Sequence, residues 1–133
     1  DAYTKMDDSM SVEDILLETT ADLQEELKKA GNNDITTLIG FENHSGHTYL
    51  SEEGKPLGKV IKGKGNNGKD RTEGAHYKNA FGTFLHGPLL AKNPHFADLL
   101  LAKSLSPQEE IALKPLDDRF EILAHNTMKK RLL

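Results

Sequence analysis

His86 is the side chain of this sequence best suited to acid–base chemistry. It ends an apolar run and is followed by Gly87 and Pro88, so we expect it at the end of a strand, facing a cleft. An imidazole gains and loses a proton near neutral pH, so it can act as a general base and then as a general acid. The alternative is a partly buried structural histidine, which is the commoner role of a lone histidine. By themselves, the residues around His86 favour that alternative.

Several histidines raise the question of a metal site: His44, His47, His76 and His86. Protein zinc sites usually draw on Cys or on histidines that share one face of a helix. The chain contains no Cys, and the segment Asn43-His44-Ser45-Gly46 is predicted to be a turn. We therefore expect no metal here.

A stretch rich in lysine and glycine, residues 59–71, could imitate a phosphate-binding loop. It lacks the Gly-x-x-x-x-Gly-Lys-Ser/Thr pattern, and no helix clearly follows it. We expect a solvated loop instead, with contact to a partner protein as a second option.

The length, charge and composition of the chain argue against several classes of protein. The chain has 133 residues, a length that suits one domain, and its formal net charge of −4 argues against a nucleic-acid partner. No stretch approaches 18 apolar residues, so we expect no membrane span and a cytoplasmic protein. The absence of Cys excludes disulfides and any cysteine nucleophile supplied by this chain.

The first two thirds of the sequence favour strands, and the last third favours helices. We predict strands over 11–20, 35–41 and 57–61, one or two strands over 75–85, and a loop over 63–74. An early helix is predicted over 21–30. This order is typical of an α+β protein or of a fragment of an α/β domain.

Three features predict the late helices. Asn93 and Pro94 indicate a helix start, and residues 106–109 resemble a capping box. A last helix should follow, with Asp117 and Asp118 in its first turn and basic residues 129–131 in its last. The residues predicted to line one side of it are Leu116, Phe120, Leu123 and Thr127.

Two longer segments carry a family resemblance. Residues 40–50 read GFENHSGHTYL and residues 77–90 read YKNAFGTFLHGPLL. Together they resemble the glutamine amidotransferase domains of the cobyric acid synthase type. Within that family they are most similar to the amidotransferase subunits of lipid II isoglutaminyl synthases.

The resemblance implies a flavodoxin-like α/β fold of the class I glutamine amidotransferases. In this family the nucleophilic cysteine lies at a strand-to-helix elbow in the preceding half of the domain. Residues 1–133 would then be the C-terminal portion of one such domain, and the N-terminal portion that bears the cysteine would be absent.

The same resemblance implies roles for specific residues. His86 matches the catalytic base that forms the thiolate and protonates the leaving ammonia. Asn43, His44, Ser45 and Gly46 match a loop beside the glutamine pocket, where backbone groups can hold the substrate; the alternative is a plain β-turn.

Three positions depart from the expected pattern. The acid that many amidotransferases carry two residues after the histidine is replaced by Pro88. His86 must then be oriented by another group, such as a backbone carbonyl or a carboxylate of a partner subunit. His47 stands where the family usually has Arg, which weakens any contact with an acidic neighbour. Residues 9–12 replace a basic element of the family.

The implied function is glutamine hydrolysis that supplies ammonia to a Mur-ligase-like synthetase, for amidation of the D-glutamate of lipid II in peptidoglycan synthesis. The chain itself would need no cofactor, and ATP would bind to the synthetase. One alternative is a domain that amidates cobyrinate or cobyric acid. Another, of a different class, is a non-catalytic docking module that lacks the nucleophile.

Overall fold

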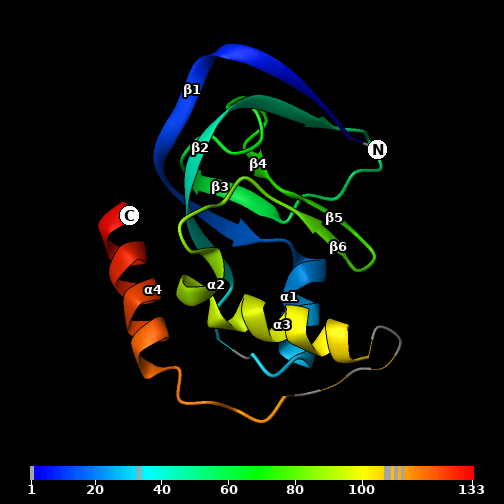
Figure 1. The fold of residues 1–133 in the computed structure, drawn as a ribbon, viewed down its shortest axis with the longest axis vertical. Coiled ribbons are helices and arrows are strands. Elements are labelled where there is room, and N and C mark those ends of the chain that lie inside the picture. Colours follow the sequence, from blue (N-terminus) through cyan, green and yellow to red (C-terminus); the bar gives the residue numbers. More distant parts are fainter. Residues whose placement is uncertain (1, 33, 107–108, 110, 112) are drawn as a thin grey trace.

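The computed structural model describes residues 2–32, 34–106, 109, 111 and 113–133. Its main sheet has four strands in the order β2-β1-β3-β4, all pairing antiparallel (Figure 1). The strands are β1 (Ala2–Thr19), β2 (Thr37–Leu50), β3 (Gly58–Lys62) and β4 (Thr72–Glu73). A small second sheet pairs β5 (Ala75–Tyr77) with β6 (Ala80–Gly82). The predicted strands are thus confirmed, whereas β4 lies within residues 63–74, which were predicted to be a loop.

Four helices complete the described chain: α1 (Ala21–Lys29), α2 (Leu89–Lys92), α3 (Pro94–Leu105) and α4 (Arg119–Leu132). Three of them follow the strands in sequence, as predicted, and α1 confirms the early helix. The Thr20 side chain accepts a hydrogen bond from the backbone N–H of Leu23 and so caps α1. None of the helices among the described residues is long and apolar enough to cross a bilayer.

The two faces of β1 and β2 have different coverings. On one face, Ile15 and Leu17 of β1 pack into a buried core with Leu23 of α1 and with Phe96 and Leu99 of α3. Side chains alternate between the faces of a strand, so the intervening Leu16 and its partner Ile39 lie on the opposite face, where both are fully buried. Helix α4 contacts β1 and β2 as well. The sheet is therefore the middle layer of this half of the molecule.

The predicted turn at residues 43–46 is wrong, because this segment lies inside the continuous strand β2. Three of its residues are paired with β1: Asn43 with Val12, His44 with Ser11 and Gly46 with Met6. The irregularity falls in β1 instead, between Met6 and Ser11. Pairing with a long neighbouring strand overrides the local turn preference, as is common for strands.

The predicted apolar side of the last helix is also wrong. Leu116 precedes α4, and the side chains of Phe120 and Leu123 are 71% and 62% exposed, whereas His125 is fully buried. Asp118 is the N-cap residue rather than a first-turn residue, and Asp117 precedes it. The basic residues of the last turn are confirmed.

The predicted capping box can be followed only in part. Ser106 is the C-cap residue of α3. Residues 107 and 108 lie outside the described residues. Glu109, the last residue of the motif, lies in a bend of the backbone. At the other end of α3, Pro94 is the first helical residue, as predicted.

Candidate active site

His86 is held against the outer edge of β2 by its backbone. Its N–H donates to the carbonyl of Phe41 at 2.8 Å, and its carbonyl accepts from the N–H of Phe41 at 3.2 Å. The preceding Leu85 is buried in the core, while the His86 side chain is exposed. Gly40 permits this approach, since a Cβ there would lie 2.7 Å from Cβ of Leu85. The backbone is anchored and the imidazole faces solvent.

The pairing determines which residues share the face of His86. Residues directly opposite one another project to the same face of a sheet, so His86 lies on the face of Phe41. Alternation along β2 adds Asn43, which is exposed, and the pairing with β1 adds Asp14 and Val12. Val12 is 55% exposed although it is apolar. These side chains form an exposed surface beside the imidazole.

The orientation of the His86 ring is set by a main-chain group. Its Nδ1 makes a short hydrogen bond with the carbonyl oxygen of Phe84. A carbonyl oxygen only accepts, so Nδ1 must carry the proton. In the neutral imidazole Nε2 is then the basic nitrogen. This is the tautomer that a general base with a free Nε2 requires, and it arises without the acid that Pro88 replaces.

The four residues of the predicted loop do not form one surface. Asn43 lies on the face of His86, whereas His44 points to the other face and is buried. The His44 ring stacks on that of Phe84, with centroids 3.9 Å apart and an interplanar angle of 7°. Its Nδ1 donates to the carbonyl of Gly46 at 2.8 Å. His44 thus packs behind the segment that carries His86.

Two buried carboxylates lie behind the same segment, and no sequence motif predicted them. Glu42 accepts from the N–H groups of Lys64 and Gly65, at 2.6 and 2.8 Å, and its Oε2 lies 3.5 Å from Nε2 of His44. Glu73, at the end of β4, is fully buried. Its Oε1 accepts from the hydroxyl of Thr83 at 2.7 Å and from the N–H of Phe84 at 2.8 Å. Burial raises the pKa of Glu73, and the charge of Glu42 raises it further.

Only part of the stretch at residues 59–71 is the predicted loop, because residues 59–62 belong to β3 and residues 63–71 form the loop. Asn66, which is buried, donates from its side-chain amide to the carbonyl of Gly74 at 3.0 Å and accepts from the N–H of Gly74 at 3.0 Å. Asn67 donates to Asp70 at 2.6 Å. The loop is therefore tied to the strand region by its asparagines, and its lysines are exposed.

His47 lies beside an acid, as the substitution for Arg suggested. Its Nδ1 is 3.6 Å from Oδ2 of Asp7 in β1. Hydrogen bonds from Ser9 lower the pKa of Asp7, and His47 adds a smaller effect. In the described part of the chain, no three His, Cys, Asp or Glu side chains are grouped so that they could hold a metal ion.

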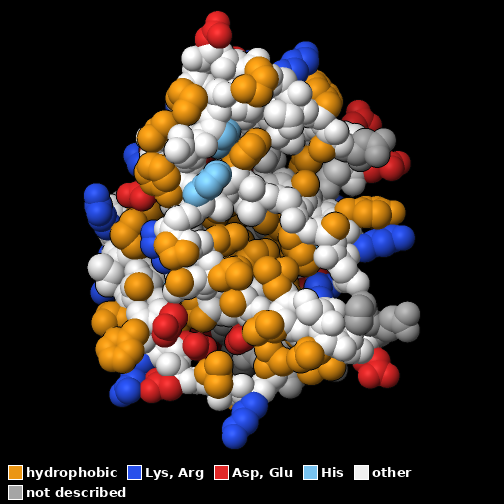
Figure 2. Space-filling model, in the orientation of Figure 1, with side chains coloured by type: hydrophobic (Ala, Val, Ile, Leu, Met, Phe, Trp, Pro, Cys, Tyr) orange, Lys and Arg blue, Asp and Glu red, His pale blue; other side chains and the backbone are white. Residues whose placement is uncertain are grey.

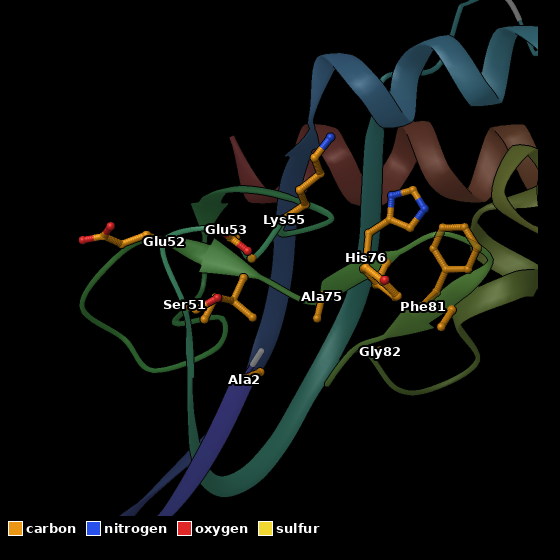
Figure 3. Close-up of a pocket in the computed structure, with 13 residues that line it drawn as sticks. Ala2, Ser51, Glu52, Glu53, Lys55, Ala75, His76, Phe81 and Gly82 are labelled. Atoms are coloured by element: carbon orange, nitrogen blue, oxygen red, sulfur yellow. The ribbon is translucent and has the colours of Figure 1, made fainter.

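A separate groove of about 960 Å³ opens beyond the far end of β2. Figure 3 shows His76 of β5 and Phe81 of β6 side by side in its wall, with Lys55 on the same side and Glu52 directed away. The rings of His76 and Phe81 stack with centroids 4.4 Å apart. The residues that line this groove do not include His86 or Asn43.

Comparison with known proteins identifies what the chain is similar to. Residues 1–94 match the family described as the CobB/CobQ-like glutamine amidotransferase domain. The chain is 45% identical over 84 residues to the lipid II isoglutaminyl synthase (glutamine-hydrolyzing) subunit GatD of Streptococcus pneumoniae (strain ATCC BAA-255 / R6), a match that covers 62% of this chain and 32% of that protein. It is 44% identical over 97 residues to the subunit of the same name from Staphylococcus aureus (strain N315), covering 71% and 39%. The chain spans about a third of the length of these curated relatives.

Proposed function

Because the chain belongs to the CobB/CobQ-like glutamine amidotransferase domain family, we propose that it is the histidine-bearing part of a glutaminase. In this proposal His86 is the general base and general acid. The observation that carries it is the Nδ1 contact with the carbonyl of Phe84, which leaves Nε2 basic on an exposed face of the sheet.

The proposed reaction uses a cysteine supplied from outside residues 1–133, since this sequence contains none. Nε2 of His86 takes the proton of that thiol, and the thiolate attacks the side-chain amide carbon of glutamine. The imidazolium returns the proton to the amide nitrogen as the C–N bond breaks and ammonia leaves. A water molecule, deprotonated by Nε2, then attacks the thioester, and glutamate and the thiol are released.

The substrate is proposed to lie along β2 beside His86. Asn43 projects to the same face as His86, and its main-chain groups point to the same strand edge as those of Phe41, because alternate residues of a strand share a side. It is therefore the residue of the predicted set best placed to bind glutamine. His44, Ser45 and Gly46 stay in the proposed substrate-binding segment, with His44 acting from behind through Phe84.

The acceptor of the ammonia is proposed from the names of the relatives. Both are glutamine-hydrolysing subunits of lipid II isoglutaminyl synthase. We place this chain in the same reaction, the amidation of the D-glutamate of lipid II, with a Mur-ligase-like synthetase as partner and ATP bound to that partner. Glutamine and ATP are supplied in the cytoplasm, where we place the reaction. Amidation of cobyrinate or cobyric acid is the alternative within the family.

The test is glutaminase activity of the complete subunit with its synthetase partner, compared with the His86→Ala variant. We expect ammonia release to fall by at least about 100-fold, since a positioned acid–base group contributes about 10²–10⁴-fold. His47→Ala is the control, because the His47 ring lies beside Asp7 and has no role in the reaction proposed above. Unchanged ammonia release in His86→Ala would remove His86 from the mechanism.

The absence of Cys favours a second candidate function, a docking module without catalysis. In that case the complete protein would bind the synthetase and release no ammonia from glutamine. The same assay, together with measurement of complex formation, separates the two functions.

A further inference from the structure

A chain of hydrogen bonds connects the buried Glu73 to His86. The hydroxyl of Thr83 donates to Oε1 of Glu73 at 2.7 Å. The same hydroxyl oxygen accepts from the N–H of Leu85 at 3.1 Å. That N–H belongs to the peptide unit whose carbonyl, contributed by Phe84, accepts from Nδ1 of His86. Carboxylate, hydroxyl, peptide and imidazole therefore follow one another without a gap.

The bond dipoles of this chain point the same way. Each group donates toward Glu73 and accepts from the side of His86, so each bond polarises the next one in the same sense. A carboxyl oxygen at one end therefore favours the Nδ1–H form of the imidazole at the other end. This is the effect that an acid bonded directly to Nδ1 would have in other histidine-dependent sites.

Further contacts hold Glu73 and the Phe84–Leu85 peptide in place. Oε1 of Glu73 also accepts from the N–H of Phe84 at 2.8 Å. The Phe84 ring is stacked on His44, and the following Leu85 is buried in the core. Glu73 itself is anchored because its carbonyl accepts from the N–H of Leu57 at 2.9 Å. Little freedom remains for the carbonyl that orients His86.

The burial of Glu73 is costly, which a purely structural role does not explain. The side chain is fully buried, and its Oε2 has no hydrogen-bond partner among the described residues. An unpartnered buried polar atom destabilises the folded state. Glu42 shows the contrast, since both of its oxygens accept from backbone N–H groups, those of Lys64 and Gly65, in a different loop.

We propose that Glu73 is a positioning residue for His86, acting through Thr83 and the Phe84–Leu85 peptide. The role is distinct from catalysis, because Glu73 acts on His86 from within the protein interior. The inference rests on the proposed function of His86 as the base.

The test combines a spectroscopic readout with kinetics in the complete subunit bound to its synthetase. The tautomer of His86 is measured from the ¹⁵N shifts of its ring nitrogens, and kcat and KM for glutamine hydrolysis are measured in parallel. Thr83→Val removes the hydroxyl and keeps the side-chain shape at an exposed position. We expect a mixture of His86 tautomers and a fall in kcat of about 10- to 100-fold, the usual effect of losing an orienting contact, with little change in KM.

Two variants of Glu73 and one control variant test the role of the carboxylate. Glu73→Gln keeps a side-chain oxygen acceptor for Thr83 and Phe84, so we expect it to retain the Nδ1–H tautomer and most of the activity. Glu73→Ala removes the acceptor and should behave like Thr83→Val. Glu42→Gln is the matched control: the oxygens of this buried carboxylate accept from the N–H groups of Lys64 and Gly65 and lie beside His44, outside the hydrogen-bond chain that ends at His86. It should leave the tautomer of His86 unchanged.

The outcomes separate this inference from the proposed function. If Thr83→Val and Glu73→Ala leave the His86 tautomer and kcat as they are, the relay is wrong. If Glu73→Ala does not fold, Thr83→Val decides alone, and Thr83→Ser should restore the tautomer because it restores the hydroxyl. If His86→Ala keeps full glutaminase activity, the proposed base is wrong, whereas a tautomer change in Thr83→Val would still establish the connection.

Discussion

The orientation of His86 depends on the main chain of its own neighbours. The Phe84 carbonyl lies two residues before the imidazole that it binds, and the peptide is fixed because Leu85 is buried and Phe84 is stacked on His44. The orientation of His86 therefore depends on the packing of Leu85 and on the stacking of Phe84 on His44. A substitution that moves residues 84–86 should reduce activity even when it is remote from the substrate.

Gly40 offers a direct test of that dependence. In Gly40→Ala the new Cβ would lie 2.7 Å from Cβ of Leu85, closer than packed carbon atoms approach. The backbone of β2 or of residues 85–86 must then shift, so we expect the free energy of unfolding to fall by about 1–3 kcal/mol. We also expect kcat for glutamine hydrolysis to fall. Urea denaturation and the ammonia assay measure the two effects.

Gly82→Ala is the matched control, because no atom lies within 4 Å of a Cβ at that position. It should change the free energy of unfolding by no more than about 0.5 kcal/mol and leave ammonia release unaltered. Equal effects of the two substitutions would show that close packing of Gly40 against Leu85 does not govern the position of His86.

At the scale of elements, two buried histidines connect α3 and α4 to the sheet. Nε2 of His95 in α3 donates to the carbonyl of Thr37 at 3.0 Å. Nε2 of His125 in α4 lies 2.9 Å from the Thr37 hydroxyl, and its Nδ1 donates to the carbonyl of Lys92 at 2.8 Å. The two rings meet edge to face, with centroids 5.5 Å apart. Both helices thus meet at the first residue of β2.

These histidines predict a loss of stability in acid. Burial lowers the pKa of His95 from 6.5 to about 4, with a further contribution from His125, whose own pKa is lowered by burial. Between these pH values the unfolded chain binds a proton at His95 and the folded protein does not, so stability falls as the pH falls from about 6.5 to about 4. The shift corresponds to about 3 kcal/mol. Urea denaturation of the protein across this range measures it.

His95→Gln isolates the contribution of that ring. The Gln side chain can still donate to the carbonyl of Thr37 but does not titrate, so the dependence of stability on pH should become shallower. The comparison with the unsubstituted protein is needed because Glu73, whose pKa is raised by burial, acts in the opposite sense. Identical pH profiles for the two proteins would rule out His95 as the source.

At the scale of the whole molecule, one face of the sheet is only half covered. Leu16 and Ile39 are buried there, while Val12, Asn43 and His86 are exposed further along. In Figure 2, apolar side chains also gather in a hollow between the strands and helices α2 and α3. The chain covers about a third of the length of its relatives.

The isolated 133-residue chain should accordingly release no ammonia from glutamine above the uncatalysed background. It has a candidate base and no thiol, and a base without its nucleophile does not form the acyl intermediate. The complete subunit serves as the positive control in the same assay. Turnover by the isolated chain that disappears in His86→Ala would contradict the requirement for a cysteine.

The sequence by itself determined the family and the strands, and it predicted His86 as the base. Residues 40–50 and 77–90 carry long, ordered motifs, and the strand at 11–20 and the helix at 21–30 have strong local signals, so these features need no distant contacts. The sequence misjudged residues 43–46 and the side that α4 buries. In both places a partner far along the chain, β1 or the start of β2, overrides the local preference.

Only the tertiary structure decided how His86 is oriented and what lies behind it. The hydrogen-bond chain from Glu73 connects residues that lie 10 to 13 positions apart, and it passes through a peptide group. Because every residue type has such a group, no residue pattern predicts this hydrogen bond. The division of Asn43 and His44 between opposite faces likewise follows from strand pairing. Local sequence selects the chemical group, and the fold sets its tautomer, its exposure and its neighbours.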